Sequence, residues 1–116
     1  MTIERIHGQT RGRCRAVVQR GLVYAVATDI STTSTVAEQT KRTLEALENN
    51  LDEAGSSKDR IILATVYLRG ISKKAEMDAV WCDWIGASDN WPQSAYVASE
   101  LAGDDQVEIV LIATET

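Results

Sequence analysis

The segment 60–69 constrains the fold more than any other part of the chain, because it is rich in β-branched and aromatic residues and apolar at most positions. As a strand, it would place Ile62, Ala64, Val66 and Leu68 on one face and Ile61, Leu63 and Tyr67 on the other. A strand that is apolar on both faces is typical of the middle of a covered sheet. We therefore expect residues 60–69 to form an interior strand of a sheet.

A long amphipathic helix is expected to precede this strand. Its apolar and small residues follow a spacing of three and four, at Val36, Thr40, Leu44, Leu47, Leu51 and Ala54. The run 31–35 supplies helix-start residues, and Thr35 and Glu38 have capping-box spacing. Gly55 stands where a helix end favours a residue that adopts positive φ. The pattern thus predicts a helix of five turns over residues 36–54.

The remaining elements complete an α+β pattern. Strands are expected at 3–6, 15–19, 22–28, 94–101 and 107–113, and residues 87–92 are expected to form a loop. A second helix would be capped by Ser72, end at Gly86 and pack into the core through Met77, Val80, Trp81, Trp84 and Ile85. The order β-β-β-α-β-α-β-β predicts a two-layer domain with a mixed sheet and both helices on one face. No linker-like segment divides residues 1–116, so we expect a single domain.

Apolar residues also occur on the sheet face opposite the helices. In the last strand, Val110 and Ile112 alternate with Val107, Ile109 and Leu111. A two-layer monomer would leave one of these sets in water. We expect self-association to bury it, since large exposed apolar patches mark interaction surfaces.

Charge and hydropathy exclude several classes of partner. Acidic residues outnumber Lys and Arg 17 to 12, which gives a net charge of −5 over 116 residues. Residues 1–20 carry a net +4, residues 70–116 carry a net −7, and no Arg follows Arg69. A nucleic-acid partner is not expected, because phosphate binding needs a positive surface. The longest nearly apolar run, 61–68, is far too short to cross a membrane, and we expect a cytoplasmic protein.

Neither the cysteines nor the single histidine form a recognisable motif. Cys14 and Cys82 lack CxxC spacing and are expected to be reduced thiols without an adjacent base. His7 is the only histidine, and no regular spacing of Cys, His and carboxylate predicts a metal site. No cofactor is expected. A Ser-His-Asp triad built on His7 has no supporting motif.

The order and spacing of a series of residues along the chain resemble those of the Rid family, the reactive intermediate deaminases, also called the YjgF family. The series comprises Glu38-Gln39-Thr40, the helical leucines, Ala54-Gly55-Ser56, Lys58, the strand 61–68, Met77, Trp81, Trp84, Pro92 and Val107-Glu108-Ile109. The resemblance extends over about residues 14–114. It implies a chorismate-mutase-like α+β fold in a homotrimer, with the sheets packed into a central barrel and three clefts between subunits.

The resemblance also implies a deamination chemistry, and this sequence departs from the motif that supports it. Deaminating members hydrolyse enamine or imine acids to 2-keto acids and ammonia; an Arg in a Pro-x-Arg motif grips the carboxylate, and a Glu in the last strand activates water. Here Pro92-Gln93-Ser94 replaces Pro-x-Arg, with Ser94 at the Arg position, or Gln93 if the register slips by one. Only Glu108 matches a family functional residue outright.

Two other cleft positions also differ from the family. Val26-Ala27-Thr28 replaces a Ser-Gly-Gln stretch, and Asp78 replaces an Asn of the second helix, placing Asp78 at the cleft rim or simply on the surface.

Each candidate residue has a structural alternative. Glu108 is either a cleft carboxylate that acts as acid and base or a sheet-edge residue bonded to backbone. Ser94 and Gln93 either contact a polar ligand or only begin a strand. Tyr96 either walls the cleft or only packs. Trp91 either stacks on a ligand or shields the cleft mouth, or it lies in the core or an interface.

The Arg-rich start of the chain supplies one more candidate group. Arg13 or Arg15 of a neighbouring subunit could replace the missing guanidinium, in line with the bidentate pairing that guanidinium offers a carboxylate. The structural alternative is that Arg11, Arg13 and Arg15 simply form a solvated face.

Three functions follow from this pattern. The first is a homotrimer that binds a small polar metabolite and converts an imine or enamine larger than the simple 2-imino acids, with Glu108 as acid/base. The second is a non-catalytic binding or regulatory trimer. The third is a deaminase of 2-iminopropanoate type that uses an N-terminal Arg as its carboxylate clamp. Ribonuclease activity, attached to relatives of this fold, is disfavoured by the charge.

Overall fold

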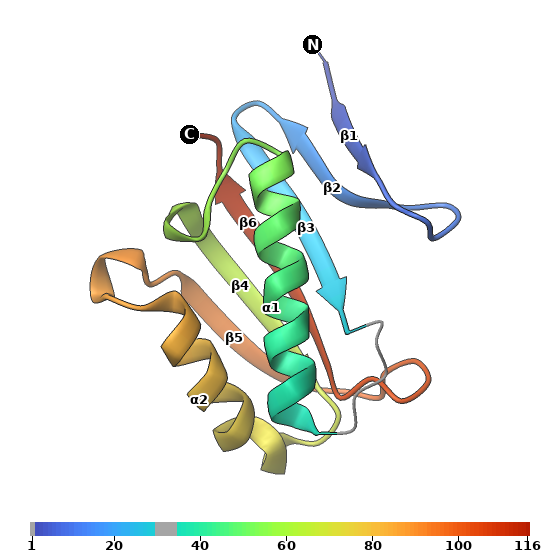
Figure 1. Ribbon diagram of the computed structural model, residues 1–116, viewed down its shortest axis with the longest axis vertical. Helices are drawn as coiled ribbons and strands as arrows, with labels where there is room; N and C mark the ends of the chain where they lie inside the picture. The colour runs from blue at the N-terminus through green and yellow to red at the C-terminus, as the bar shows by residue number, and fades with distance from the viewer. Residues whose placement is uncertain (1, 30–34) are drawn as a thin grey trace.

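The computed structural model describes residues 2–29 and 35–116 and confirms the predicted order of elements (Figure 1). Its strands and α-helices are β1 (Glu4–His7), β2 (Cys14–Gln19), β3 (Leu22–Thr28), α1 (Val36–Glu53), β4 (Ile61–Leu68), α2 (Lys74–Ile85), β5 (Gln93–Ala98) and β6 (Val107–Thr114). Both helices lie on the same face of the sheet, as predicted, and the β1–β2 hairpin extends beyond them (Figure 1).

The six strands form one mixed sheet in the order β1-β2-β3-β6-β4-β5. Only the β4–β5 pair is parallel. The segment predicted to be interior, β4, does lie between two strands, β6 and β5. Strand β5 ends at Ala98 rather than at residue 101, because Ala98 pairs with the last residue of β4, Leu68.

The predicted facing of β4 is wrong at its start. The β4–β6 register shifts between Ile61 and Leu63, so Ile61 and Ala64 are both buried on the helix face, whereas Ile62 is 49% exposed. A β-bulge of this kind places an extra residue against one partner residue and changes the alternation of side chains. Strict alternation over residues 61–68 therefore fails at one position.

The predicted start of α1 is confirmed, and its end lies one residue earlier than predicted, at Glu53 with Ala54 as the C-cap. The Thr35 hydroxyl accepts a hydrogen bond from the Glu38 amide at 3.1 Å, which satisfies one free donor of the first turn. Residues 31–34, included in the predicted helix start, lie outside the described residues. At the other end Gly55 has φ +80°, and the Ser56 amide donates to the Leu51 carbonyl at 2.8 Å. That bond across a glycine of positive φ is the Schellman helix end.

The start of α2 differs from the prediction. Ser72 lies in a 3-10 turn (Ile71–Lys73), and the residue that precedes α2 is Lys73, which makes no side-chain capping bond. The rest of the prediction holds, since α2 ends at Gly86 with φ +76° and buries Met77, Trp81 and Ile85. Trp84 is only partly buried, because its Nε1 reaches Glu48 Oε1 at 2.8 Å.

The two faces of the sheet differ in how far they are covered. The helix face carries fully buried residues of β3, β6 and β4, among them Val23, Ile109, Leu111, Ala64 and Leu68. We call the opposite side the open face; it carries Val17, Tyr24, Val26, Thr28, Leu63, Thr65, Tyr67, Glu108, Val110 and Ile112. These side chains are partly buried by their neighbours, and Tyr24 is 42% exposed. The predicted second apolar face therefore exists and is uncovered in one chain.

In the described part of the chain, no helix is both long enough and apolar enough to cross a membrane.

Candidate functional site

Glu108 lies on the open face near the start of β6. Its neighbours in the sheet are Thr28 of β3 and Tyr67 of β4, so it belongs to an interior strand. The alternative that it is a sheet-edge residue is therefore wrong. Glu108 shares its face with Val110 and Ile112, as predicted, and its half-buried carboxylate forms no hydrogen bond or ion pair with the described residues. A carboxylate in such a position keeps its lone pairs available for a ligand or water.

Ser94, Tyr96 and Asp78 lie on the other side of the sheet. In the parallel register Ser94 is beside Ala64 and Tyr96 is beside Val66, both of which are buried beneath the helices. The Tyr96 hydroxyl donates to Asp78 Oδ1 of α2 at 2.7 Å. Ser94 and Tyr96 thus share a face, as predicted, but it is the face opposite Glu108.

The surroundings of Tyr96 hold its hydroxyl in the protonated form. Burial, followed by the hydrogen bond to Asp78 and that carboxylate's negative charge, raises the pKa of Tyr96 to about 12. Lys74 Nζ lies 4.5 Å from the centre of the ring, a cation–π contact on the same side of α2. The Tyr96 hydroxyl is therefore a hydrogen-bond donor at neutral pH and is already engaged by Asp78.

The two predicted residues around Pro92 are on the surface. Gln93 is the exposed first residue of β5, which is an edge strand of the sheet. Trp91 is 65% exposed, and its Nε1 donates to the Gly86 carbonyl at 2.9 Å. The core alternative for Trp91 is therefore wrong, while its contact with Gly86 fixes the ring at the end of α2.

The N-terminal arginines do not behave as one solvated face. Arg15 donates from Nη1 to Asn50 Oδ1 and from Nη2 to Glu53 Oε2, both at 2.6 Å, and from Nε to the His7 carbonyl at 3.0 Å. Its guanidinium therefore ties the β1–β2 hairpin to α1. Arg13, in contrast, is exposed and makes no bond with the described residues, so it is the arginine of this pair that stays available.

Val26 of β3 pairs with Val110 of β6, and both side chains lie on the open face. The next pair along these strands is Ala27 with Ile109. The third-strand position predicted to contact a ligand is therefore on the same face as Glu108. It offers only an apolar side chain there.

A pair that the sequence analysis missed lies in the β1–β2 hairpin. Cys14 Sγ is 3.7 Å from His7 Nδ1, so the expectation that neither cysteine has an adjacent base is wrong for Cys14. The predicted strands 3–6 and 15–19 contain neither residue, and the pair forms only because the β1–β2 register shifts between Ile6 and His7. Cys82 is exposed on α2, and both thiols are free.

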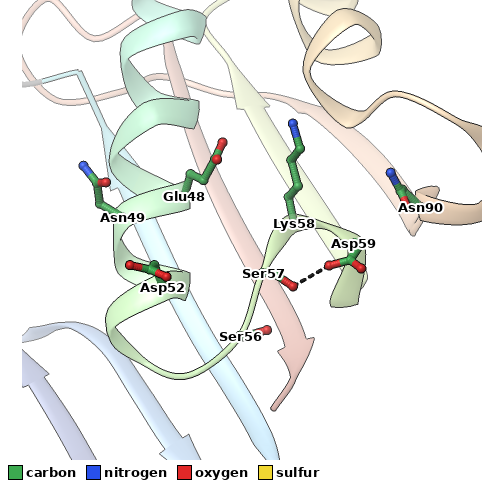
Figure 2. Close-up of a pocket in the computed structure, with 8 residues that line it drawn as sticks. All are labelled: Glu48, Asn49, Asp52, Ser56, Ser57, Lys58, Asp59 and Asn90. Carbon is green, nitrogen blue, oxygen red and sulfur yellow. Dashed lines mark hydrogen bonds between the residues drawn. The ribbon is translucent and has the colours of Figure 1, made fainter. Parts of the chain in front are cut away.

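A hollow of about 440 Å³ lies between the end of α1, the turn that precedes β4 and the turn that follows α2 (Figure 2). It is lined by Glu48, Asn49, Asp52, Ser56, Ser57, Lys58, Asp59 and Asn90. The Ser57 hydroxyl donates to Asp59, which lowers the pKa of that carboxyl (Figure 2). None of the predicted site residues lines this hollow, and its polar, acidic wall does not resemble the expected cleft.

The described residues hold no group of three or more His, Cys, Asp or Glu side chains placed to bind a metal ion. The described residues therefore offer three places for chemistry: the unbonded carboxylate of Glu108, the Tyr96–Asp78 pair and the Cys14–His7 pair.

Comparison with known proteins gives consistent matches. The family model described as Endoribonuclease L-PSP matches residues 15–115. A RutC family protein of Haemophilus influenzae is 30% identical over 98% of this chain and 99% of its own, and one of Haemophilus ducreyi is 35% identical over 66% of this chain and 65% of its own. The chain thus spans just under two thirds of the second relative.

Solved structures agree with the sequence matches. A YjgF family protein of Neisseria meningitidis superposes with a TM-score of 0.91 at 33% identity, covering 100% of this chain and 97% of that one. The fold is therefore that of the YjgF proteins, as the resemblance implied. The chain belongs to the Rid (YjgF) family, whose family model is described as endoribonuclease L-PSP.

Proposed function

We propose that this protein is a homotrimer that binds a small polar metabolite in clefts between its subunits and hydrolyses an imine or enamine there, with Glu108 as acid and base. The observation that carries the proposal is the half-buried, unpartnered Glu108 on an apolar sheet face that its own chain leaves uncovered.

The open face supports the assembly. Tyr24 is 42% exposed there, and it adjoins the partly buried Val17 and Ile112 in the neighbouring strands. A contiguous apolar surface of this kind is stabilised by burial against another chain. Membership of the Rid family supports three as the number of chains.

The positions of the candidate residues support a cleft shared between chains. Glu108 is on the open face, whereas Ser94, Tyr96 and Asp78 are on the helix side of the edge strand β5. One chain therefore separates these groups by the thickness of its own sheet. A cleft containing all of them takes Glu108 from one subunit and Ser94 and Tyr96 from the next.

The chemistry requires one group that both accepts and returns a proton. The Glu108 carboxylate takes a proton from water while the water oxygen adds to the carbon of the C=N bond. The carboxyl group returns this proton to nitrogen, which gives an adduct with a hydroxyl and an amino group on one carbon. The carboxylate then moves the hydroxyl proton to nitrogen, the C–N bond breaks as the C=O bond forms, and ammonia leaves a carbonyl product. The serine at position 94 contacts a neutral or polar group, since it cannot neutralise a carboxylate as Arg does.

This difference in the cleft directs the choice of substrate. Simple 2-imino acids are expected to be slow substrates unless Arg13 of a neighbouring subunit binds their carboxylate. Larger imines, in which another polar group meets Ser94, are expected to be faster.

A panel of imines generated in place from different amino acids by amino-acid oxidases tests the proposal. The wild-type protein should accelerate loss of at least one imine, and Glu108→Gln should reduce that rate by at least about a hundredfold, the usual contribution of a general acid or base. Glu100→Gln, which neutralises an exposed carboxylate, is the matched control and should retain the rate. Equal rates for Glu108→Gln and wild type would overturn the assignment.

Mixing of subunits tests whether the cleft is shared. Glu108→Gln and Ser94→Trp should each be inactive alone, and trimers assembled from both should regain activity, because some clefts then combine intact groups from two chains. No recovery in trimers of verified mixed composition would contradict a shared cleft.

Ligand-induced thermal stabilisation without turnover of any imine would instead favour the non-catalytic trimer. Rapid loss of 2-iminopropanoate that depends on Arg13 would favour the deaminase with an N-terminal carboxylate clamp. The family description names an endoribonuclease, but the net charge of −5 and the engagement of Arg15 and Arg69 by their own chain disfavour RNA as a substrate.

A further inference from the structure

The β1–β2 hairpin brings together the only histidine and one of the two cysteines. His7 pairs with Cys14 while Ile6 pairs with Ala16, so Arg15 is an extra residue in β2 at this point. The irregularity allows Arg15 to reach α1 while Cys14 stays beside His7, with Sγ 3.7 Å from Nδ1. The bond from Arg15 Nε to the His7 carbonyl holds the backbone of this pair in place.

A hollow of about 420 Å³ adjoins the pair and is positively charged. It is lined by Arg5, His7, Gly8, Thr10, Gly12, Arg13, Cys14 and Val17, which include two arginines and no carboxylate. Neither Arg5 nor Arg13 forms an ion pair with the described residues. Cys14 is half-buried here, so its sulfur is accessible from the hollow and partly shielded from water.

We propose that this hollow is a cysteine-modification site for small anionic disulfides, with His7 as the base. The Cys14 thiol proton passes to His7 Nδ1, and the thiolate attacks one sulfur of the disulfide. The S–S bond of the reagent breaks, a mixed disulfide forms on Cys14, and the departing thiolate takes the proton from His7. The sulfur of Cys14 is oxidised and the departing sulfur is reduced, so electrons and protons balance.

The charges of the hollow give the site its selectivity. Carboxylates on the incoming disulfide meet Arg5 and Arg13. This inference does not rest on Glu108, because every group that carries it lies in the β1–β2 hairpin.

Cys82 provides an internal control, since it is exposed on α2 and has no histidine beside it. Each cysteine's rate of mixed-disulfide formation can be followed by mass spectrometry of peptides, with glutathione disulfide as the anionic probe and cystamine as the cationic one. Because His7 Nδ1 can accept the thiol proton during attack, Cys14 should react at least about tenfold faster than Cys82 with glutathione disulfide.

Two sets of variants separate the base from the charges. His7→Gln, which retains hydrogen-bonding capacity at an exposed edge position, should lower the rate of Cys14 toward that of Cys82 with both probes. The double variant Arg5→Gln/Arg13→Gln should remove the preference of Cys14 for glutathione disulfide over cystamine. Cys14 of this variant should still react faster than Cys82. Circular dichroism verifies that each variant is folded.

Two results would overturn the proposal. One is a Cys14 rate equal to or below that of Cys82 with glutathione disulfide. The other is a Cys14 rate that His7→Gln leaves unchanged in a folded protein.

Discussion

Replacement of Arg15 by Met should destabilise the protein, because its guanidinium anchors the β1–β2 hairpin to α1. The methionine retains the aliphatic stem and loses three hydrogen bonds, to Asn50, Glu53 and the His7 carbonyl. This substitution separates a structural role for Arg15 from the carboxylate-binding role that its position in the sequence suggests.

The magnitude follows from the exposure of the three partners. Asn50 is 4% exposed, so its charge-assisted bond contributes about 1.5 kcal/mol. The ion pair between Arg15, whose side chain is 38% exposed, and Glu53, whose side chain is 50% exposed, contributes about 0.5 kcal/mol. The bond to the exposed His7 carbonyl adds about 0.5 kcal/mol. We expect a loss of about 2.5 kcal/mol in the free energy of unfolding, or a decrease of about 10 °C in Tm.

Thermal and urea denaturation at one fixed protein concentration measure this loss, since the stability of an oligomer depends on concentration. Arg11→Met is the matched control: Arg11 is exposed and makes no bond with the described residues, so its replacement should change stability by less than about 0.5 kcal/mol. Equal stability of Arg15→Met and Arg11→Met, with loss of ligand binding only in Arg15→Met, would refute the structural role.

Two further predictions concern single interactions. Asp78→Asn should lower the pKa of Tyr96 from about 12 toward 10, which a titration followed by tyrosinate absorbance measures. Because folding raises the pKa of Tyr96, its contribution to stability is complete below pH 10 and is lost as the pH rises toward 12. Arg69→Met should remove the bonds from the guanidinium to the carbonyls of Asp105, Leu101 and Gly103, which accelerates amide exchange over residues 101–106 while α1 stays protected. An unchanged Tyr96 titration, or unchanged exchange in this loop, would contradict the respective contact.

The fold was predictable because its local patterns are long and mutually consistent. Thr35 and Gly55 set the boundaries of α1 by chemistry that depends only on neighbouring residues. The bulge at Ile62 and the start of α2 were not predictable, since each depends on register or packing with a distant element. In the same way, Arg15 looked like a surface residue until α1 placed Asn50 and Glu53 beside it.

The candidate site was predictable only in part. The alternation of β6 correctly placed Glu108 with Val110 and Ile112. No local pattern indicates that Ser94 and Tyr96 lie on the opposite side of the sheet, because their facing is determined by pairing of β5 with β4. The Cys14–His7 contact depends in turn on an irregular hairpin register.

The molecular mass in solution tests the central claim, a cleft shared between subunits, most directly. Sedimentation equilibrium at micromolar concentration should give three times the chain mass of 12.7 kDa. A mass of one chain would contradict the account, because Glu108 and Ser94 would then remain on opposite faces of one sheet with no second chain to bring them together.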